Sequence, residues 1–320
     1  MIRLQEYIMK LESWLSKFMK EIIQQIKNMD IGRIEEDVSL KKYTTYRAGG
    51  IARCVVYPKN ISKLVDLMRF LKQTGVVHKI LGRGSNLLFS EKTYEGILIK
   101  LDEFDYIHFF GRGKIRVGAG ASLIKVSLLA AKKGYTGLEF AAGIPGSIGG
   151  AIFMNAGAYK SDMGYIVESV KVLTSDLKII HLENREMDFH YRSSYLQKHP
   201  DYVCLEAIIK LQKGKKEAIA EVIRDRRNRR LESQPLEFPS AGSVFRNPEG
   251  NFAGKLIEDL GLKGKVKGGA MVSDKHANFI INRDGATSDD IKYLIDLCHE
   301  KVLKNYGIDL KIEQEFVNWE

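Results

Sequence analysis

An apolar side chain recurs every three or four positions through the first 29 residues, the period of one face of an α-helix. The pattern predicts an amphipathic helix of about seven turns. Lys and Glu interrupt the pattern too often for a transmembrane span or a signal peptide, which indicates a cytoplasmic protein. We expect the helix to pack on its own domain or on a partner subunit. Its mixed charges favour this over binding to a membrane surface. The repeated positions are Leu4, Ile8, Leu11, Leu15, Phe18, Ile22 and Ile26.

The next region alternates between strand and helix patterns. We expect a strand at 52–57, a helix at 61–74 with Asn60 as its N-cap, and a strand at 78–81. This order predicts a parallel unit, and the small-residue turn at 82–86 then lies at a strand end. Such a turn presents several backbone N–H groups together and favours phosphate binding, although a simple polar turn has the same composition. The turn at 82–86 is not the GxGxxG dinucleotide fingerprint, because Leu87 follows and no third glycine opens a helix.

The region from 96 to 213 shows mainly strand patterns, with one helix, and it predicts an α+β fold. The expected strands are 97–101, 106–110, 114–117, 167–173, 178–182 and 203–211, and the expected helix is 121–133, closed by Gly134.

Glycines interrupt a core-like apolar run between Gly137 and Gly157, and Pro145 adds a fixed φ. Glycine lets a backbone come within contact distance of a ligand. The run therefore indicates a segment wrapped around a cofactor. The alternative is a tight loop between two buried elements.

The remainder of the chain is predominantly helical in pattern. The basic segment Lys213–Lys216 indicates a domain boundary, and helices are expected at 217–231, 253–260 and 288–305. This pattern predicts a separate, helix-rich domain.

The net charge of +10 over 320 residues is compatible with nucleic acid, anionic lipid or a small polyanionic substrate. Its densest part is Arg224–Arg230, where Arg226 and Arg230 share a helix face; the face is either solvated or turned toward phosphate. Three scattered cysteines and seven scattered histidines show no metal-ligand spacing, so we expect isolated thiols and no metal.

Six motifs follow one another along the chain: Tyr43–Gly50, Leu81–Leu88, Gly137–Tyr159, Tyr191–Ser194, Ser240–Pro248 and Lys275–Phe279. Together, and in this order, they resemble those of the MurB family, the UDP-N-acetylenolpyruvoylglucosamine reductases. The resemblance covers roughly residues 30–315. It implies a two-part, non-covalent FAD-binding region of the vanillyl-alcohol oxidase type and an α+β substrate domain, in the shorter, type II subtype.

The resemblance further implies an activity. NADPH would reduce FAD, and hydride from flavin N5 would reduce the enolpyruvyl group of UDP-N-acetylglucosamine enolpyruvate to UDP-N-acetylmuramate, a cytoplasmic step of peptidoglycan synthesis. By position, Ser243 would donate the proton, and Arg192 and Glu313 would complete the catalytic set. Arginine suits a developing carboxylate charge, and a well-placed serine can protonate an enolate. Glu315, two residues beyond Glu313, is the alternative carboxylate.

The resemblance also implies which residues bind the cofactor and which bind the substrate. The cofactor set is Arg47, Gly82, Arg83, Gly84, Ser85, Asn86, Gly143, Gly146, Ser147, Gly149, Gly150 and Ala156. The substrate set is Tyr191, Asn247, Lys255, His276 and Asn278.

Five segments follow from patterns and resemblance together. They are the helix at 1–29, FAD-binding subdomains at 30–95 and 96–213, a substrate domain at 214–305, and a strand at 306–320 returning to the active site. Two rival functions remain open at this point: an FAD-dependent oxidase of a small alcohol, and a non-enzymatic nucleotide or nucleic-acid binder. We expect no nucleic-acid partner, and the oligomeric state stays open.

Overall fold

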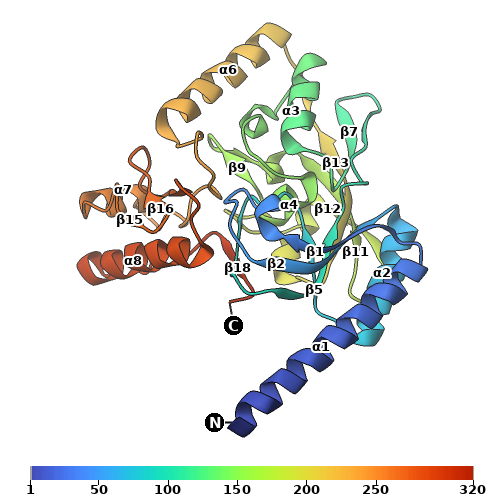
Figure 1. The fold of residues 1–320 in the computed structure, drawn as a ribbon. Coiled ribbons are helices and arrows are strands. Elements are labelled where there is room, and N and C mark those ends of the chain that lie inside the picture. The colour runs from blue at the N-terminus through green and yellow to red at the C-terminus, as the bar shows by residue number, and fades with distance from the viewer. Residues whose placement is uncertain (1, 320) are drawn as a thin grey trace.

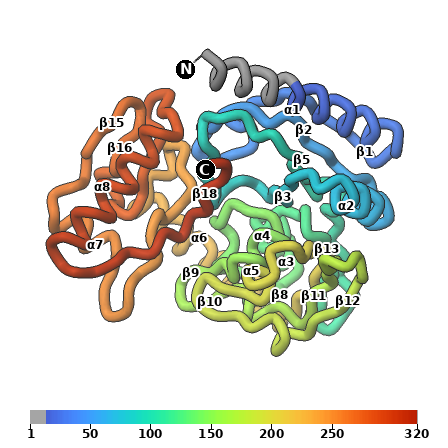
Figure 2. The backbone as a smooth tube through the Cα atoms, turned by 90° about the horizontal axis from the view of Figure 1, so that it is seen from below, coloured from blue at the N-terminus to red at the C-terminus, as the bar shows by residue number. Residues whose placement is uncertain are grey.

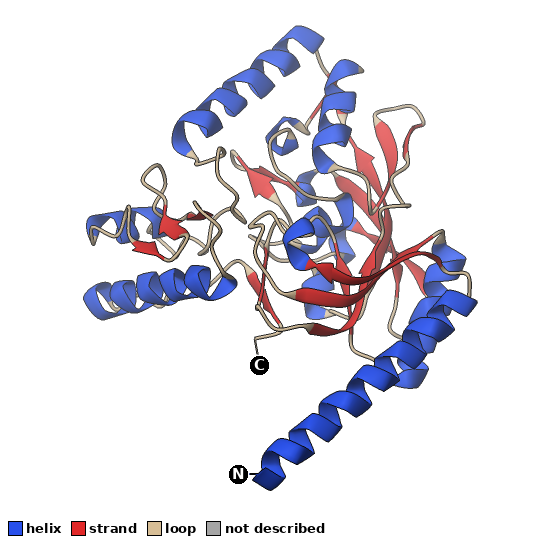
Figure 3. Ribbon diagram, in the orientation of Figure 1, coloured by secondary structure: helices blue, strands red, loops and turns tan. Residues whose placement is uncertain are grey.

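A computed structural model describes residues 2–319 of the chain, with side chains described from Trp14 onward. Two sheets and their helices form one body, and a smaller helical part lies beside them (Figure 1). Strands dominate the larger body and helices the smaller part (Figure 3).

The first sheet has the strand order β1-β2-β5-β3. The strands β2 and β3 both run parallel to β5, which lies between them, while β1 is antiparallel to β2. The parallel unit predicted from the sequence is thus confirmed, with a later strand inserted at its centre. Asn60 caps α2 as predicted, because its Oδ1 accepts from Lys63 N at 3.0 Å. The elements are β1 Gly32–Ser39, β2 Ile51–Pro58, α2 Ile61–Thr74, β3 His78–Leu81 and β5 Tyr94–Lys100.

The first helix, α1 (Ile2–Asn28), confirms the apolar period of the N-terminal segment. Its C-terminal half packs on the core through Met19, Ile22 and Ile26. Toward its N-terminal end, the axis of α1 leaves the body (Figure 1). Within residues 2–319, no helix is both long enough and apolar enough to cross a membrane.

The second sheet is antiparallel throughout, in the order β12-β11-β13-β7-β6. It shares one continuous core with the first sheet, α1 and α3. The boundary expected between residues 95 and 96 falls inside β5, which belongs to the first sheet. The elements are β6 Ile107–Phe109, β7 Lys114–Gly118, α3 Leu123–Lys132, α4 Ile148–Phe153, β11 Val167–Leu173, α5 Tyr195–Lys198, β12 Ile179–Glu183 and β13 Val203–Lys210.

The smaller part has its own core, built around α7 and α8 and a three-stranded sheet, β15-β16-β17. Its strands have two or three residues each, too short for a period-2 pattern, and the sequence did not predict them. The long α6 contacts α3 and β8 (Tyr135–Thr136) of the larger body, although the sequence pattern placed this helix in the third domain. The elements are α6 Lys216–Ser233, α7 Ala253–Asp259, β15 Val266–Lys267, β16 Ala270–Val272, β17 Ile280–Asn282 and α8 Ser288–Tyr306.

The C-terminal segment returns to the larger body. Its strand β18 (Glu315–Val317) pairs in parallel with β4 (Leu87–Phe89), and it lies between the two parts of the molecule (Figure 2). The remaining short strands are β8 Tyr135–Thr136, β9 Gly157–Ala158, β10 Ser161–Asp162 and β14 Gln212–Lys213.

Candidate functional site

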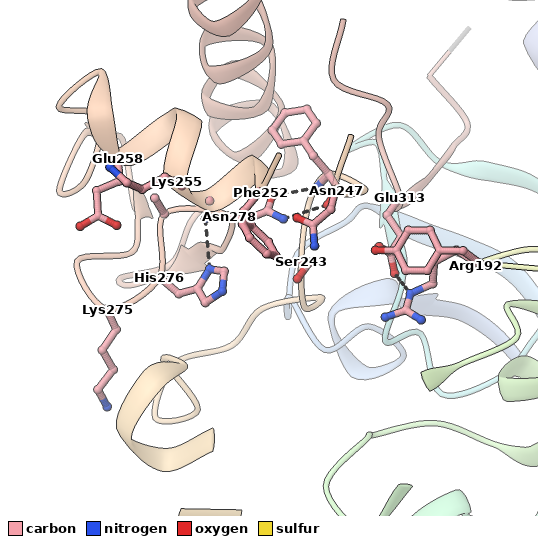
Figure 4. Close-up of a pocket in the computed structure, with 14 residues that line it drawn as sticks. Arg192, Ser243, Asn247, Phe252, Lys255, Glu258, Lys275, His276, Asn278 and Glu313 are labelled. Atoms are coloured by element: carbon pink, nitrogen blue, oxygen red, sulfur yellow. Dashed lines mark hydrogen bonds and ion pairs between the residues drawn. The ribbon is translucent and has the colours of Figure 1, made fainter. Parts of the chain in front are cut away.

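A cavity of about 370 Å³ opens where the C-terminal part faces the Tyr191–Arg192 loop (Figure 4). All eight residues that the sequence proposed for catalysis or substrate binding line it. They are Tyr191, Arg192, Ser243, Asn247, Lys255, His276, Asn278 and Glu313. Because these residues come from four separate stretches of the chain, the fold brings together what the sequence only places in order.

Arg192 and Glu313 form an ion pair at one end of this cavity (Figure 4). Arg192 Nε donates to Glu313 Oε1 at 2.7 Å, and Arg192 Nη2 donates to Gly157 O at 3.0 Å. The Arg192 backbone has a φ of 53°, in the left-handed region that non-glycine residues rarely adopt. The two side-chain hydrogen bonds fix the direction of the guanidinium.

The alternative carboxylate lies elsewhere. Glu315 forms an ion pair with Lys79, at 2.5 Å, on the outer side of the returning strand, and it does not line the cavity. Of the two candidate carboxylates, only Glu313 faces Arg192 and Ser243.

Ser243 lies on a loop whose following residues pair with the C-terminal segment. Glu313 N donates to Val244 O at 2.8 Å, and Arg246 N donates to Lys311 O at 2.9 Å. Within the part of the chain that the structure describes, no protein group hydrogen-bonds to the Ser243 hydroxyl. That hydroxyl is therefore available to a ligand in the cavity.

Two amides proposed for substrate contact are engaged in holding the backbone. Asn278 uses both ends of its side chain on Phe245, accepting from its N–H at 2.9 Å and donating to its carbonyl at 2.8 Å. Asn247 Oδ1 accepts from Ala253 N at 3.1 Å, at the first residue of α7. Asn278 therefore positions the loop that carries Ser243.

The far end of the cavity carries basic side chains. Lys255 reaches Asp259 one turn along α7, and this hydrogen bond raises the pKa of the Lys255 ammonium group. Burial lowers the pKa of His276, and its Nδ1 accepts from Asn278 N at 3.2 Å. Nδ1 therefore carries no proton, and the imidazole is in its neutral form. Lys275, which the sequence did not assign to the site, adds a further ammonium group to the lining.

Five further lining residues were outside the predicted sets: Phe252, Gly254 and Glu258, on or beside α7, and Phe245 and Ala277, inside two of the sequence motifs. Phe252 is 70% exposed although it is a large apolar side chain. An exposed aromatic at a cavity rim is a signal, but only once the fold shows which surface it joins.

The glycine-rich turn at 82–86 has free backbone donors. In the described chain no protein acceptor hydrogen-bonds to the N–H groups of Arg83, Gly84, Ser85 or Asn86. Gly84 has a φ of 63°, and a Cβ there would lie 1.9 Å from Tyr43 O. Four free donors on one glycine-held turn form a concavity that suits a phosphate group.

The second glycine-rich segment faces this turn. A Cβ built on Gly82 would lie 2.9 Å from Ser147 Oγ, so the two loops are in contact. Ser147 Oγ accepts from Gly150 N at 3.3 Å and caps α4. The turn also reaches the cavity, since Asn86 Nδ2 donates to Glu313 O at 3.0 Å.

The glycines of this segment divide into two kinds. A Cβ on Gly146 would meet no atom closer than Ser85 Oγ at 3.9 Å, so a side chain there would fill open space between the two loops. A Cβ on Gly149 would lie 3.1 Å from Ala119 Cβ and would press on the protein itself. Of these two positions, only Gly146 leaves space that a side chain could fill without pressing on the protein.

The basic face of α6 approaches the same segment. Arg226 lies over the Tyr159 ring at 5.0 Å, and Arg230 lies against Gly143, within 3.2 Å of a Cβ built there. Arg230 Nε is buried without a hydrogen-bond acceptor, and desolvation lowers the pKa of the Arg230 guanidinium. A half-buried guanidinium whose Nε has no acceptor and which has no carboxylate partner fits a site for an anionic ligand.

The other proposed cofactor residues lie on the same two loops or beside them. Arg47 lies two residues after Thr45, whose N–H donates to Gly84 O at 3.1 Å. The side chains of Arg47 and Arg83 are both exposed. Ala156 follows α4, and its N–H donates to Ala151 O at 2.8 Å.

The three cysteines are buried and unpaired, and burial raises the pKa of each thiol to about 12. Among the side chains that the structure describes, from Trp14 onward, no three of His, Cys, Asp or Glu are grouped as a metal site.

Two family models match the chain. One, described as an FAD binding domain, matches residues 52–183, and the other, the C-terminal domain of UDP-N-acetylenolpyruvoylglucosamine reductase, matches residues 234–317. The second match contains the Ser243 loop, most of the cavity lining and Glu313.

Similar proteins match over nearly the whole chain. A UDP-N-acetylenolpyruvoylglucosamine reductase of Bacillus subtilis is 41% identical over 300 residues, which are 93% of this chain and 99% of the relative. One from Anoxybacillus flavithermus is 42% identical over 302 residues, again 93% of this chain and 99% of the relative. The crystal structure of the reductase (MurB) from Thermus caldophilus has a TM-score of 0.75 and 34% identity, covering 89% of this chain and 99% of that one.

Proposed function

The chain belongs to the UDP-N-acetylenolpyruvoylglucosamine reductase family, and from this premise we propose that it reduces the enolpyruvyl group of UDP-N-acetylglucosamine enolpyruvate to UDP-N-acetylmuramate with NADPH. It is an FAD-dependent oxidoreductase of peptidoglycan precursor synthesis. The family resemblance also predicts that the reaction runs in the cytoplasm. The observation that carries the proposal is the gathering of Arg192, Ser243 and Glu313 in one cavity.

The two glycine-rich loops fit FAD as the cofactor. The free N–H groups of residues 83–86 suit its pyrophosphate, and the open space at Gly146 leaves room for a ligand between the loops. The unpartnered Arg230 supplies positive charge at Gly143. When bound, FAD supplies the redox chemistry, taking hydride from NADPH and giving it to the terminal carbon of the enolpyruvyl group.

The residues of the cavity handle the charge and the proton. Hydride addition to the terminal carbon gives an enolate conjugated with the substrate carboxylate, and Arg192 stabilises this charge through its guanidinium. Glu313 accepts from Arg192 Nε and holds the guanidinium in place. The Ser243 hydroxyl gives its proton to the adjacent carbon and completes the addition of two hydrogens.

The diphosphate of the substrate suits the basic end of the cavity. Lys255, Lys275 and the half-buried His276 line that end, and Tyr191 lines the end near Arg192. We assign Lys255 and Lys275 to the diphosphate and His276 to the nucleotide side of the substrate. Asn278 and Asn247 shape the pocket through the backbone.

The match of residues 234–317 to the reductase C-terminal domain favours this activity over oxidation of a small alcohol. The nucleic-acid alternative rested on the basic run of α6. Two of its arginines, Arg226 and Arg230, instead turn toward the glycine-rich loops.

A two-step stopped-flow experiment tests the proposal. Protein saturated with FAD is mixed with NADPH without oxygen, and the reduced protein is then mixed with the enolpyruvyl nucleotide. Bleaching in the first step, recovery of flavin colour in the second and a product two hydrogen atoms heavier support it. Protein that stays colourless after incubation with FAD, or reduced flavin that persists beside the nucleotide, would refute it.

A further inference from the structure

A buried hydrogen-bonded link connects the turn before Arg47 to the loop of Ser243. The Tyr46 hydroxyl donates to Gln314 Oε1 at 3.0 Å. On its other side, Gln314 Nε2 faces the carbonyl oxygens of Ala241, Gly242 and Ser243, at 3.2, 3.4 and 3.5 Å. The two side chains of the link are 268 residues apart in sequence.

The orientation of the Gln314 amide is determined by its surroundings. Tyr46 is fully buried, and burial raises the pKa of its hydroxyl, so the group remains a donor. A donor opposite Oε1 leaves Nε2 pointing at carbonyl oxygens, which only accept. Gln314 is 4% exposed, so each of these polar groups depends on its partner in the link.

The link is anchored at both ends. Asn282 Nδ2 donates to Tyr46 O at 2.9 Å, and Thr45 N, one residue earlier, donates to Gly84 O at 3.1 Å. At the other end, Gln314 follows Glu313, whose carbonyl accepts from Asn86. The link therefore joins the phosphate-binding turn, the Glu313 segment and the Ser243 loop.

Gln314 and Asn278 hold the Ser243 loop from its two sides. Gln314 binds the carbonyls up to Ser243, and Asn278 binds the backbone of Phe245. Between them, the Ser243 hydroxyl has no protein partner in the described chain. The position of this hydroxyl therefore depends on the backbone of the loop and on the residues that bind that backbone.

We propose that Tyr46 and Gln314 are positioning residues for the proton transfer, setting the place of the Ser243 hydroxyl relative to the substrate carbon. The inference rests on the proposed role of Ser243 as proton donor. It predicts a selective effect, because a misplacement of about 1 Å costs about a hundredfold in rate, while hydride transfer from NADPH does not use Ser243.

The test compares Tyr46→Phe and Gln314→Leu with the wild-type holoenzyme in the two half-reactions. We expect flavin reduction by NADPH to stay within about threefold and reoxidation by the enolpyruvyl nucleotide to slow by about ten- to a hundredfold. The solvent deuterium isotope effect on reoxidation should rise, because proton transfer becomes more rate-limiting. Tyr57→Phe is the matched control, since Tyr57 is equally buried and its hydroxyl bonds to Tyr43. It should lower thermal stability without slowing reoxidation.

A double variant separates positioning from general stability. In the Ser243→Ala background, Tyr46→Phe should slow reoxidation no further, because the positioned group is already gone. A further slowing as large as in wild type would overturn the inference, as would an equal loss in both half-reactions. If Ser243→Ala itself reoxidises normally, the role proposed for Ser243 fails. If Ser243→Ala is slow while Gln314→Leu is normal, only the positioning inference fails.

Discussion

Arg192 and Glu313 meet across 121 residues of sequence, with Arg192 Nε 2.7 Å from Glu313 Oε1. The pair lines the cavity beside Ser243, and the guanidinium is held at a second point by Gly157 O. Because Glu313 accepts this bond, its function in the structure is to orient Arg192. In the proposed mechanism, the substrate carboxylate meets a guanidinium that is already aligned.

The two carboxylates of the returning segment should respond differently to neutralisation. Glu313→Gln removes the charge opposite Arg192, and we expect reoxidation by the enolpyruvyl nucleotide to slow by about a hundredfold or more. Glu315→Gln removes only the partly exposed pair with Lys79 and should leave the rate within about twofold. Stopped-flow reoxidation of both variants measures the ranking. The reverse ranking would move the role to Glu315.

The glycine-rich segment offers a test of cofactor retention. Gly146→Val should leave the thermal midpoint of the apoprotein unchanged and weaken FAD binding at least tenfold, because its side chain enters the open space between the loops. Gly149→Val should lower the midpoint even without FAD, since it presses on Ala119. Fluorescence titration with FAD and thermal unfolding of the apoprotein measure both. Wild-type FAD affinity in Gly146→Val would contradict the assignment.

Arg230 should contribute to ligand binding rather than to stability. Arg230→Gln removes a half-buried charge whose Nε has no acceptor, so the apoprotein should be as stable or more stable. FAD affinity should fall about tenfold or more, the effect of losing a charged hydrogen bond. Arg229→Gln is the control, because Arg229 is exposed on the same helix and pairs with Asp225. Equal FAD affinity in the two variants would refute the role.

His276 should make stability depend on pH. Its pKa is lowered in the folded state, so the unfolded chain binds the proton more readily. Above the pKa of about 6.5 in the unfolded chain, His276 is neutral in both states and does not change the free energy of unfolding. As the pH drops below about 6.5, the unfolded chain takes up the proton first and the free energy of unfolding falls. Protonation at Nδ1 also breaks the bond from Asn278 N, worth about 1 kcal/mol. Urea unfolding at pH 7.5 and 5.5 should show a smaller acid loss in His276→Gln than in wild type. An identical loss in both proteins would contradict this.

Local patterns predicted much of the fold. The stripe of α1, the Asn60 cap and the parallel unit around residues 52–81 follow from spacing and composition, and the structure confirms them. The strands β15 to β17 were missed because two or three residues cannot show a period. The contacts of α6 with the larger body could not be predicted, because its charges are spread around the helix and no apolar face indicates its neighbour.

The candidate site was predictable as a set of residues but not as a geometry. The sequence motifs contain all eight residues proposed for catalysis or substrate binding, except Lys255 and Glu313, which lie outside them, and all eight line the cavity. The choice between Glu313 and Glu315 depends on which face of the returning segment meets Arg192, and that is a tertiary property. The roles of Asn278 and Gln314 likewise depend on backbone groups 33 and 71 or more residues away. No local pattern contains such partners.

The most direct test of the account is the pair of half-reactions in Ser243→Ala beside wild type. With FAD bound, the variant should be reduced by NADPH at a rate within about threefold of wild type, because this step needs no proton from Ser243. Its reoxidation by UDP-N-acetylglucosamine enolpyruvate should be slower by about three orders of magnitude or more, within the range that a positioned acid contributes. Reoxidation at the wild-type rate, or an equal loss in both steps, would contradict the assignment of Ser243 as the proton donor.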